Sequence, residues 1–443
     1  MTRILCATSA MSGHVRPMLP VVRQLVDAGH EVLWYTANEF TELVTGAGAR
    51  FVPMSDSVGY RGALRRSAGR GGVLGLNRMV LEFFIKPVPA YVADLRPVFD
   101  EFQPSLVVTD SSFRAAVFLA EQRNVPRAAF SFGPLNLSSV DTPPFGFGLR
   151  PAAGGWWRLR DRMLSWALRR VVCRQAQRVA CDVRESMNLR PLDGFFIDWV
   201  AQVADRYVQS GVPDYEYPRS DLPDSVVFVG PLFAEGGNSD PLPDWWPDLA
   251  AARSAGRPVV LITQGTVATD PANLVRPAIA ALADSEALLV AITSGREPAD
   301  VLPVEQRPDN LRLAKFIPYP AVLPYADVMV TNGGYGGVQQ GLAHGVPIVA
   351  CGTSEDKGEV SARVVWSGAG ISLKTNRTSP RDVRQAVDRV LTDPAYTVRA
   401  RQIAEAHQNY GGAKDAVAAI LGLLSLDPVI MPEAGSKSPG PVR

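Results

Sequence analysis

The sequence predicts an α/β protein whose two doubly wound parallel sheets face each other across a cleft. Three observations support this prediction. Short, uninterrupted apolar runs alternate with amphipathic helical patterns, as expected for strands buried on both faces of a parallel sheet. The alternation occurs twice, once on each side of a proline-rich stretch. The 443 residues are enough for two hydrophobic cores, at roughly 100–200 residues per domain.

The first forty residues supply the first strand–helix–strand unit. Residues 4–8 form the apolar run, and a polar loop from Ser9 to Arg16 follows. Pro17 suits the first turn of a helix, and Gly29 suits its end. Residues 32–35 are the next strand, so a right-handed parallel crossover is predicted.

The same alternation continues along the chain. We expect strands at 106–109 and 128–132 around a helix at 115–123. Beyond prolines spread over 213–247, we expect strands at 259–263, 288–293, 328–331, 348–351 and 371–373, with a helix at 272–283. This predicts an N-terminal α/β domain at 1–220, a proline-rich linker at 221–250 and a C-terminal α/β domain at 251–425. Helices at 399–407 and 413–424 end the second domain and are free to pack back on the first, and 426–443 form a disordered tail.

Composition excludes several classes of protein. The chain has 45 basic and 44 acidic residues, so no electrostatic reason exists to bind nucleic acid. No apolar stretch is long enough for a membrane span, and the N-terminal apolar run is too short for a signal peptide, which predicts a cytoplasmic protein. Four cysteines without a CxxC pair indicate free thiols. Only six basic residues are lysine, and the bias toward arginine and alanine is typical of a GC-rich bacterial genome.

His14 and Asp110 are the candidate catalytic residues. His14 follows the first strand and Asp110 follows the strand at 106–109, so both lie where a doubly wound sheet presents ligand groups. A histidine there is a candidate general base, and a carboxylate that reaches it would fix its tautomer. The alternatives are a loop histidine and a helix N-cap, a role that Ser111 or Ser112 could also fill.

The segment from Thr331 to Gly337 is the strongest local motif. Its four glycines, at 333, 334, 336 and 337, fall between a predicted strand and a helix. They let backbone amides approach a phosphate at a helix N-terminus, although a tight turn alone would also need them. The spacing fits neither an ATP-hydrolysing P-loop nor a dinucleotide-binding fingerprint.

Two shorter segments offer polar groups to the same cleft. Gly265 and Thr266 follow the first strand of the second domain. Glu355, Asp356 and Lys357 follow a later strand, where a carboxylate and an ammonium could hold sugar hydroxyls or form a solvated surface pair. No cluster of metal-ligating residues is found.

Together these motifs resemble the UDP-glycosyltransferase superfamily of GT-B fold, with two Rossmann-like domains, and most closely its bacterial macrolide and natural-product members. The resemblance covers residues 3–424. The family's donor motif is His-Gly-Gly-x-Gly-Ser-x-x-Glu-Ala-x-x-x-Gly-Val-Pro, followed after a fixed interval by Pro-x-x-x-Asp-Gln. It corresponds here to Asn332 through Pro347, then Gly352, then Asp356 and Lys357, with every spacing kept.

The resemblance implies a metal-independent, inverting glycosyltransferase without a cofactor. Its co-substrates would be a nucleotide sugar, UDP-hexose above all, and a small-molecule hydroxyl acceptor. His14 would be the base, supported by Asp110. Donor-binding positions would be Gly265, Thr266, Asn332, Gly333, Gly334, Gly336, Gly337, Gln340, Glu355, Asp356 and Lys357.

Four donor positions depart from the family pattern. Asn332 replaces a histidine and cannot become cationic, and Gly337 replaces a phosphate-binding serine. Gln340 replaces the glutamate that takes the ribose hydroxyls. Lys357 replaces a glutamine and brings a positive charge beside Asp356, either to neutralise it or to face the donor phosphates.

The residues that bind the acceptor are harder to identify from the sequence. Acceptor pockets in the family are shaped by variable loops, here expected at 58–88 and 137–155. Phe84, Phe132 and Phe145 are the predicted acceptor-binding residues, whereas Trp34, Phe83 and Phe147 are open to either pocket or core. Residues 156–178 carry seven arginines against one acid and predict a basic amphipathic helix, either an ordinary surface helix or one that contacts a membrane.

Four functions therefore stay open at this point. One of them, another GT-B enzyme such as a sugar-nucleotide epimerase, fits the fold but explains the paired His14 and Asp110 less well. The other three are as follows. The first is transfer of a hexose from a UDP- or dTDP-sugar to a natural product or metabolite, as in antibiotic biosynthesis. The second is a transferase that acts on a lipid at a membrane surface. The third is a GT-B protein that has lost catalysis and serves as a binding or helper subunit, which the donor-site departures favour and the retained pair of His14 and Asp110 disfavours.

Overall fold

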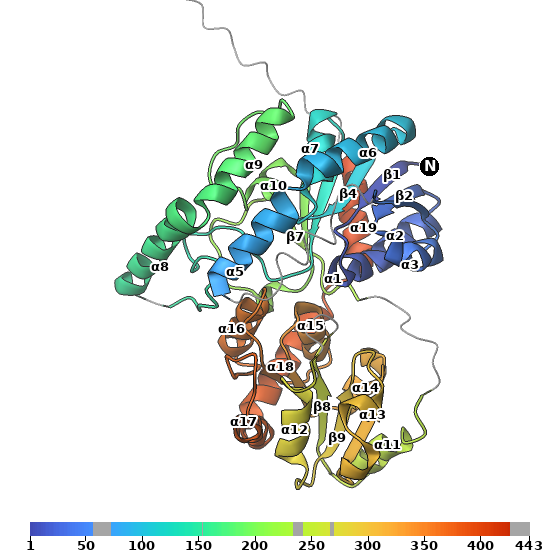
Figure 1. Ribbon diagram of the computed structural model, residues 1–443, viewed down its shortest axis with the longest axis vertical. Coiled ribbons are helices and arrows are strands. Elements are labelled where there is room, and N and C mark those ends of the chain that lie inside the picture. Colours follow the sequence, from blue (N-terminus) through green and yellow to red (C-terminus); the bar gives the residue numbers. More distant parts are fainter. Residues whose placement is uncertain (56–71, 153, 234–241, 266–269, 426–443) are drawn as a thin grey trace, which may run out of the picture.

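The computed structural model describes residues 1–55, 72–152, 154–233, 242–265 and 270–425. They form two lobes, each built on a parallel sheet flanked by helices (Figure 1). The predicted fold class is therefore confirmed. Predictions for 58–71, for 266–269 and for the tail at 426–443 lie outside the described residues.

The sheet of the first lobe has seven parallel strands in the order β3-β2-β1-β4-β5-β6-β7. In chain order these are β1 (Arg3–Ala7), β2 (Glu31–Thr36), β3 (Arg50–Pro53), β4 (Leu106–Asp110), β5 (Arg127–Ser131), β6 (Arg206–Gln209) and β7 (Val226–Phe228). The helices are α1 (Ser12–Val15), α2 (Leu19–Asp27), α3 (Thr41–Gly46), α5 (Gly72–Met79), α6 (Val88–Phe102), α7 (Arg114–Gln122), α8 (Gly155–Ala167), α9 (Arg174–Ser186) and α10 (Trp199–Val203).

The second lobe has six parallel strands in the order β10-β9-β8-β11-β12-β13. These are β8 (Val259–Thr263), β9 (Leu288–Ile292), β10 (Leu311–Ala314), β11 (Val328–Thr331), β12 (Ile348–Ala350) and β13 (Gly370–Ser372). The remaining helices are α11 (Pro247–Ser254), α12 (Val275–Leu282), α13 (Pro298–Val301), α14 (Tyr319–Val322), α15 (Tyr335–Ala343), α16 (Lys357–Ser367), α17 (Pro380–Thr392), α18 (Pro394–His407) and α19 (Ala413–Leu421).

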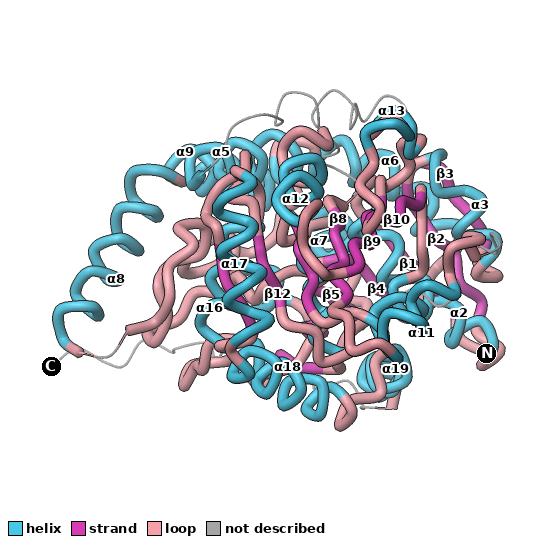
Figure 2. Tube along the Cα trace, turned by 90° about the horizontal axis from the view of Figure 1, so that it is seen from below, coloured by secondary structure: helices cyan, strands magenta, loops and turns pink. Residues whose placement is uncertain are grey.

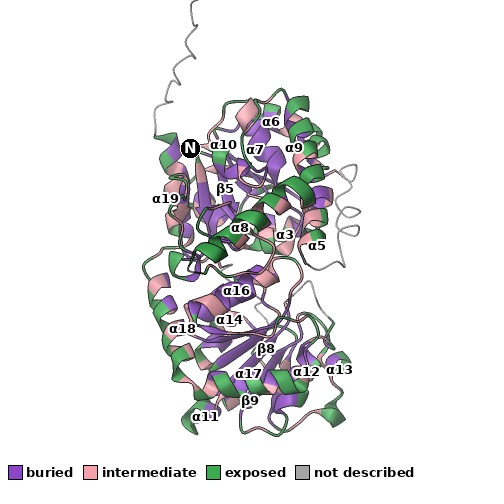
Figure 3. Cartoon of the chain, turned by 90° about the vertical axis from the view of Figure 1, so that its left-hand side faces the viewer, coloured by how far each residue is buried: buried purple, intermediate pink, exposed green. Residues whose placement is uncertain are grey.

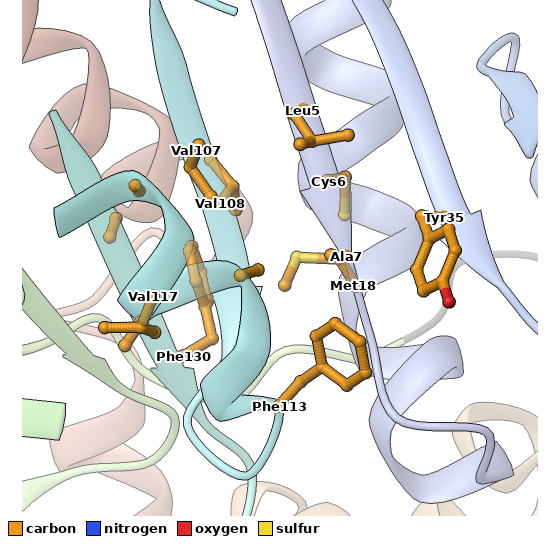
Figure 4. Packing of buried hydrophobic residues seen from close by; sticks show 14 of the residues in the cluster. Leu5, Cys6, Ala7, Met18, Tyr35, Val107, Val108, Phe113, Val117 and Phe130 are labelled. Atoms are coloured by element: carbon orange, nitrogen blue, oxygen red, sulfur yellow. The ribbon is translucent and has the colours of Figure 1, made fainter. Parts of the chain in front are cut away.

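The central strands are buried on both faces, which explains their unbroken apolar runs. Residues Ile4 to Ala7 of β1 are fully buried, and so are Leu106 to Val108 of β4. Leu5, Val107 and neighbouring side chains pack against helices beside the sheet (Figure 4). This core fixes the carboxyl ends of β1 and β4 next to each other, because Ala7 pairs with Thr109 in the parallel register.

Two segments contain more helix than the sequence predicted. The helix expected at 399–407 begins earlier, at Pro394, because the Asp393 side chain accepts the Ala395 amide and caps it. The variable loop expected at 58–88 is helical in its described part, where α5 continues into a π-helical turn at Val80–Ile85.

The prediction of a single helix over 156–178 is wrong. A π-helical turn at Leu168–Val172 separates α8 from α9. It points Leu168 and Cys173 into a buried cluster, which explains why the helical period changes there.

The chain returns to the first lobe at its C-terminal end. Helix α19, red in Figure 1, packs on α2, and Ala413, Ala416 and Ile420 are buried in the first lobe's core. Helix α8 does the opposite and extends away from the body of the first lobe in both views (Figures 1 and 2). The strands are largely buried, whereas α8 is mostly exposed (Figure 3).

Candidate active site

His14 and Asp110 meet at the carboxyl ends of β1 and β4. His14 lies in the short helix α1, which follows the β1 loop, and Asp110 is the last residue of β4. His14 Nδ1 lies 3.1 Å from Asp110 Oδ1. Because the two strands are parallel neighbours, residues 96 positions apart become hydrogen-bond partners.

Asp110 is held as a carboxylate. Its Oδ2 accepts the Ser9 amide at 2.6 Å, and its Oδ1 accepts the Ser112 amide at 2.8 Å. Burial alone raises the pKa of Asp110, but the interactions with His14 and the two backbone amides outweigh burial and lower this pKa below its usual value. An ionised Asp110 favours the His14 tautomer that carries its proton on Nδ1, which leaves Nε2 able to accept a proton. The His14 side chain is 22% exposed.

His14 borders a cavity of about 1730 Å³ that lies between the lobes, whereas Asp110 is fully buried behind it. We call the lining residues between Ala10 and Phe233 the N-terminal wall, and those between Thr263 and Lys357 the C-terminal wall. Pockets for one small ligand are typically ~300–1,000 Å³, so this cavity has room for two.

Aromatic side chains surround His14 on the N-terminal wall. The centroids of the Phe84 and Phe132 rings lie 6.3 and 6.4 Å from the centroid of the His14 ring, and Phe145 lines the same cavity. These are the three residues that the sequence predicts for the acceptor.

The other three aromatic residues of the sequence analysis do not line the cavity. Trp34 and Phe83 are buried in the core. Phe147 packs against a separate buried cluster that contains Phe195 and Trp199. These three residues therefore belong to the buried interior of the protein rather than to the acceptor pocket.

The glycine-rich turn forms the C-terminal wall between β11 and α15. Asn332, Gly334, Gly336 and Gly337 line the cavity, where the first N–H groups of α15 lack helical partners. Gly333 lies behind this wall with a φ of +82°, and a Cβ there would approach Ser361 Oγ to 3.3 Å. Gly333 therefore serves the turn, whereas the other glycines present backbone to the cavity.

Gly265 stands opposite Asn332 on the same wall. It has a φ of +74°, and a Cβ there would lie 3.4 Å from Asn332 Oδ1. Both residues line the cavity. Thr266 lies outside the described residues.

The segment from Glu355 to Lys357 lines the cavity at the start of α16. The Lys357 ammonium is buried and pairs with the Glu355 carboxylate and, at 3.3 Å, with Ser354 Oγ. Glu355 is thus the hydrogen-bonding partner of this ammonium, rather than Asp356. Burial raises the pKa of Asp356, and Glu355 raises it further, while Lys357 opposes both.

Gln340 also lines the cavity, whereas its neighbour Gln339 does not. Gln339 is buried on the other side of α15, where its Oε1 lies 3.0 Å from His407 Nε2. The helical period therefore separates a glutamine that can meet a ligand from one that anchors the helix.

A buried ion cluster connects helix α16 of the second lobe with the loop of the first lobe that contains Phe145. Glu359 of α16 accepts the amides of Gly146 and Gly148, at 2.7 and 2.8 Å, with one carboxylate oxygen. Its other oxygen pairs with Arg363, which also binds Glu216 at 2.7 Å. The loop that contains Phe145 is therefore held by the helix that begins at Lys357.

Several lining residues were missed by the sequence analysis. On the C-terminal wall they include Ser294, Phe316 and Tyr319, and on the N-terminal wall Arg114, Phe195, Phe196 and Tyr207. Phe316 follows the end of β10, so the rule that identified Gly265 could have found it. Arg114 carried a different signal, because a cation at the first position of a helix opposes the helix dipole.

Within the described residues, no group of three or more His, Cys, Asp or Glu side chains could hold a metal ion. None of the helices in this part of the chain is both long and apolar enough to cross a membrane.

Comparisons with known proteins agree on one family. Residues 278–419 match the family described as erythromycin biosynthesis protein CIII-like, C-terminal domain. The 4'-demethylrebeccamycin synthase of Lentzea aerocolonigenes is 40% identical over 427 residues, which cover 95% of this chain and 99% of that relative. This chain belongs to the UDP-glycosyltransferase superfamily. It is a glycosyltransferase of the natural-product type, as the sequence motifs predicted.

Further matches extend this relationship. UDP-glucosyltransferase 1 of Beauveria bassiana is 31% identical over 431 residues, which cover 90% of this chain and 91% of that relative. Among solved structures, the glycotransferase of kitacinnamycin superposes with a TM-score of 0.72 at 22% identity and covers 95% of this chain and 98% of its own. The glycosyltransferase VinC, solved in complex with dTDP, superposes with a TM-score of 0.67 at 21% identity and covers 96% of this chain and 99% of its own. These two structures support the GT-B fold.

Proposed function

We propose that this chain is an inverting O-glycosyltransferase that acts in the bacterial cytoplasm. It moves a hexose from a UDP- or dTDP-sugar, with UDP-hexose the expected donor, to a hydroxyl of a small natural product. One observation carries the proposal: His14, held by Asp110, borders the same cavity as the glycine-rich N-terminus of α15. A base and an anion-binding helix end thus share one space with room for two substrates.

In the proposed reaction, His14 Nε2 takes the proton of the acceptor hydroxyl while Asp110 stabilises the imidazolium that forms. The acceptor oxygen attacks the anomeric carbon from the face opposite the diphosphate. The new carbon–oxygen bond forms as the bond to the diphosphate oxygen breaks, and the electron pair of that bond leaves with the nucleotide. Attack from the opposite face inverts the anomeric configuration.

Donor binding is proposed for the C-terminal wall. The amides at the start of α15 and the Asn332 side chain would hold the diphosphate and stabilise its developing charge, so the proposal needs neither metal nor cofactor. Gln340 would meet the ribose hydroxyls, and Glu355, Asp356 and Lys357 the sugar. Relatives named UDP-glucosyltransferases favour UDP-glucose as the donor.

Thermal-shift titration with UDP, dTDP, GDP and ADP tests the donor assignment first. A ligand at a hundred times its dissociation constant stabilises the folded state by about 2.7 kcal/mol. We expect UDP or dTDP, but not GDP or ADP, to raise the melting temperature. Product analysis with the matching sugar nucleotide and a panel of aromatic alcohols, with and without EDTA, then tests transfer, anomeric inversion and metal independence.

The helper-protein alternative predicts a different result. A protein that has lost catalysis through its donor-site departures would respond to none of the four nucleotides at millimolar concentration. That result would replace the transferase proposal with the helper function.

The outward face of α8 favours a contact with a lipid surface, as in the second of the functions considered above. Trp156 is 75% exposed and Trp166 is 63% exposed, and Leu159 and Met163 lie between them along one helical face. Seven arginines against one aspartate in residues 156–178 complement an anionic lipid surface. A second copy of this chain would bring the same positive charge to that face, which disfavours self-association there.

Sedimentation with lipid vesicles tests this contact. We expect binding to vesicles that contain phosphatidylserine, weaker binding to pure phosphatidylcholine, and loss of binding when Trp156 and Trp166 are both replaced by serine. The double variant Val304→Ser and Val398→Ser, at exposed apolar sites elsewhere, is the control. Equal sedimentation of the protein with and without anionic vesicles would eliminate the membrane contact.

A further inference from the structure

Arg114 is a nearly buried cation on the N-terminal wall. It is the first residue of α7, directly beyond the strand end that carries Asp110. The residue is only 7% exposed, yet it lines the cavity. Its guanidinium carbon lies 5.9 Å from the centroid of the Phe196 ring, which lines the same cavity.

This guanidinium lacks an ionic partner among the described residues. No ion pair or side-chain hydrogen bond of Arg114 is present there, and its Nε is buried without a hydrogen-bond partner. The charge of Asp110 acts on Arg114, but the Asp110 oxygens are taken by Ser9, His14 and Ser112. Burial lowers the pKa of Arg114 to about 10, with Tyr207 and Asp110 opposing the shift, so the group stays charged at neutral pH.

Two other buried arginines, Arg184 and Arg363, are paired with carboxylates. Arg184 makes two hydrogen bonds to Glu121, at 2.8 and 2.9 Å, and Arg363 pairs with Glu216 and Glu359. A buried charge is costly unless it is paired, and a cation at a helix N-terminus adds an unfavourable dipole interaction. Arg114 therefore differs from Arg184 and Arg363, whose charges are compensated within the fold.

We propose that Arg114 binds an anionic group of the acceptor. The acceptor would be an aromatic hydroxyl compound that also carries a carboxylate or a similarly acidic group. Phenylalanine rings from several segments supply apolar walls for its ring system, namely Phe84, Phe132, Phe195 and Phe196. A planar guanidinium matches a carboxylate with two parallel hydrogen bonds. This inference rests on the proposed function, because it takes the N-terminal wall as the acceptor site.

A structural role is the competing explanation. Arg114 could act only through its neighbours, by supporting the charge of Asp110 or the hydroxyl of Tyr207. In that case its replacement would affect acidic and neutral acceptors equally. The two explanations therefore differ in the selectivity between a charged and an uncharged version of one compound.

A matched pair of probes measures that selectivity. The first probe is 6-hydroxy-2-naphthoate, and the second is its methyl ester, which keeps the rings and the hydroxyl but removes the charge. Binding of each is measured by calorimetry without any donor, to the full-length protein and to Arg114→Gln, Arg114→Lys and the surface control Arg178→Gln.

We expect the acid to bind the unmodified protein and Arg178→Gln at least tenfold more tightly than the ester. Arg114→Gln should remove this preference and leave ester binding within about twofold. Arg114→Lys should keep part of it, because the charge remains but the two-pronged geometry is lost. This variant preserves the test if Arg114→Gln fails to fold, and its preference must then be smaller than that of the unmodified protein.

Three results would overturn the proposal. They are equal binding of acid and ester, no acid binding at millimolar concentration, and a preference that survives Arg114→Gln or Arg114→Lys unchanged. Binding of UDP and of dTDP is measured separately by thermal shift on the same samples. A normal response to UDP or dTDP with no acid preference refutes the Arg114 inference alone, whereas no response to either nucleotide refutes the proposed function.

Discussion

The two walls of the cavity offer different groups to a ligand. The C-terminal wall includes a stretch of bare backbone, at the glycine-rich turn and the open end of α15. The N-terminal wall presents side chains, with His14, Arg114 and several phenylalanines arriving from separate elements. A backbone site suits a ligand that many relatives share, such as a diphosphate, whereas a side-chain site can be changed one residue at a time. We therefore propose that the C-terminal wall carries the chemistry common to relatives and that the N-terminal wall carries the individual specificity.

The largest expected effect tests whether the N-terminal wall also supplies the chemistry. Replacing His14 with alanine removes the proposed base, so kcat should fall by roughly 10²–10⁴-fold. The dissociation constant for UDP should change by less than about twofold, because UDP would bind the other wall. Initial-rate kinetics and calorimetry with UDP measure the two quantities.

His30→Ala is the control, because this histidine is outside the residues that line the cavity. Turnover of His14→Ala within tenfold of the unmodified protein would remove His14 from the proposed role. A large loss of UDP affinity would instead show that the two walls do not divide the work as proposed.

The second prediction concerns the loss of folding stability in acid. It should begin at a higher pH for His407, which packs behind the C-terminal wall, than for Asp110 on the other side of the cavity. His407 is buried against Gln339 of α15, and burial lowers the pKa of His407 from 6.5 to about 4. As pH falls through this window, the unfolded chain binds a proton that the folded protein does not, so stability is lost. The shift corresponds to roughly 3 kcal/mol. The pKa of Asp110 is lowered from 3.8, so its stabilising contribution is lost only at lower pH.

Urea unfolding at pH 7, 5.5 and 4.5 measures this difference. The unmodified protein should lose more stability between pH 7 and 4.5 than His407→Gln, in which the amide can still hydrogen-bond to Gln339. His30→Gln should behave like the unmodified protein. Parallel losses in the unmodified protein and His407→Gln would show that another group causes the acid sensitivity.

The third prediction tests the connection between the walls. Glu359→Gln removes the charged acceptor for the Gly146 and Gly148 amides and weakens the pairing with Arg363. Hydrogen bonds to charged groups contribute about 1.5–3 kcal/mol. We expect KM for the acceptor to rise by about ten- to thirtyfold, because the loop that carries Phe145 loses its anchor, while UDP affinity changes little.

Steady-state kinetics with each substrate varied in turn separate these effects. Glu305→Gln, an exposed change in the same lobe, should leave both constants unaltered. An equal rise in acceptor KM and in the dissociation constant for UDP would point to general disturbance of α16 rather than to the loop.

The same contrast explains what the sequence could predict. Strand ends and glycine spacing are local patterns, so they indicated the fold, the His14–Asp110 juxtaposition and the cavity position of Gly334, whereas the family resemblance indicated that of Gln340. Side chains on the N-terminal wall have no shared spacing. The role proposed for Arg114 follows from its burial and from the lack of an ionic partner among the described residues, which only the packed structure shows. The break between α8 and α9 was missed for a similar reason, since a π-helical turn depends on which side chains the core accepts.

The smallest expected effect asks how closely a ligand approaches the C-terminal wall. A Cβ at Gly336 meets no atom within 4 Å, so Gly336→Ala should fold normally and gain up to about 1 kcal/mol of helix stability. The added methyl group would occupy the space that the diphosphate needs against the backbone, so UDP should bind about three- to tenfold more weakly. Gly46→Ala is the matched control, because it also meets open space but lies outside the cavity-lining residues. Unchanged UDP affinity in Gly336→Ala would mean that the diphosphate does not rest on this turn, and the assignment of shared chemistry to a backbone wall would fail there.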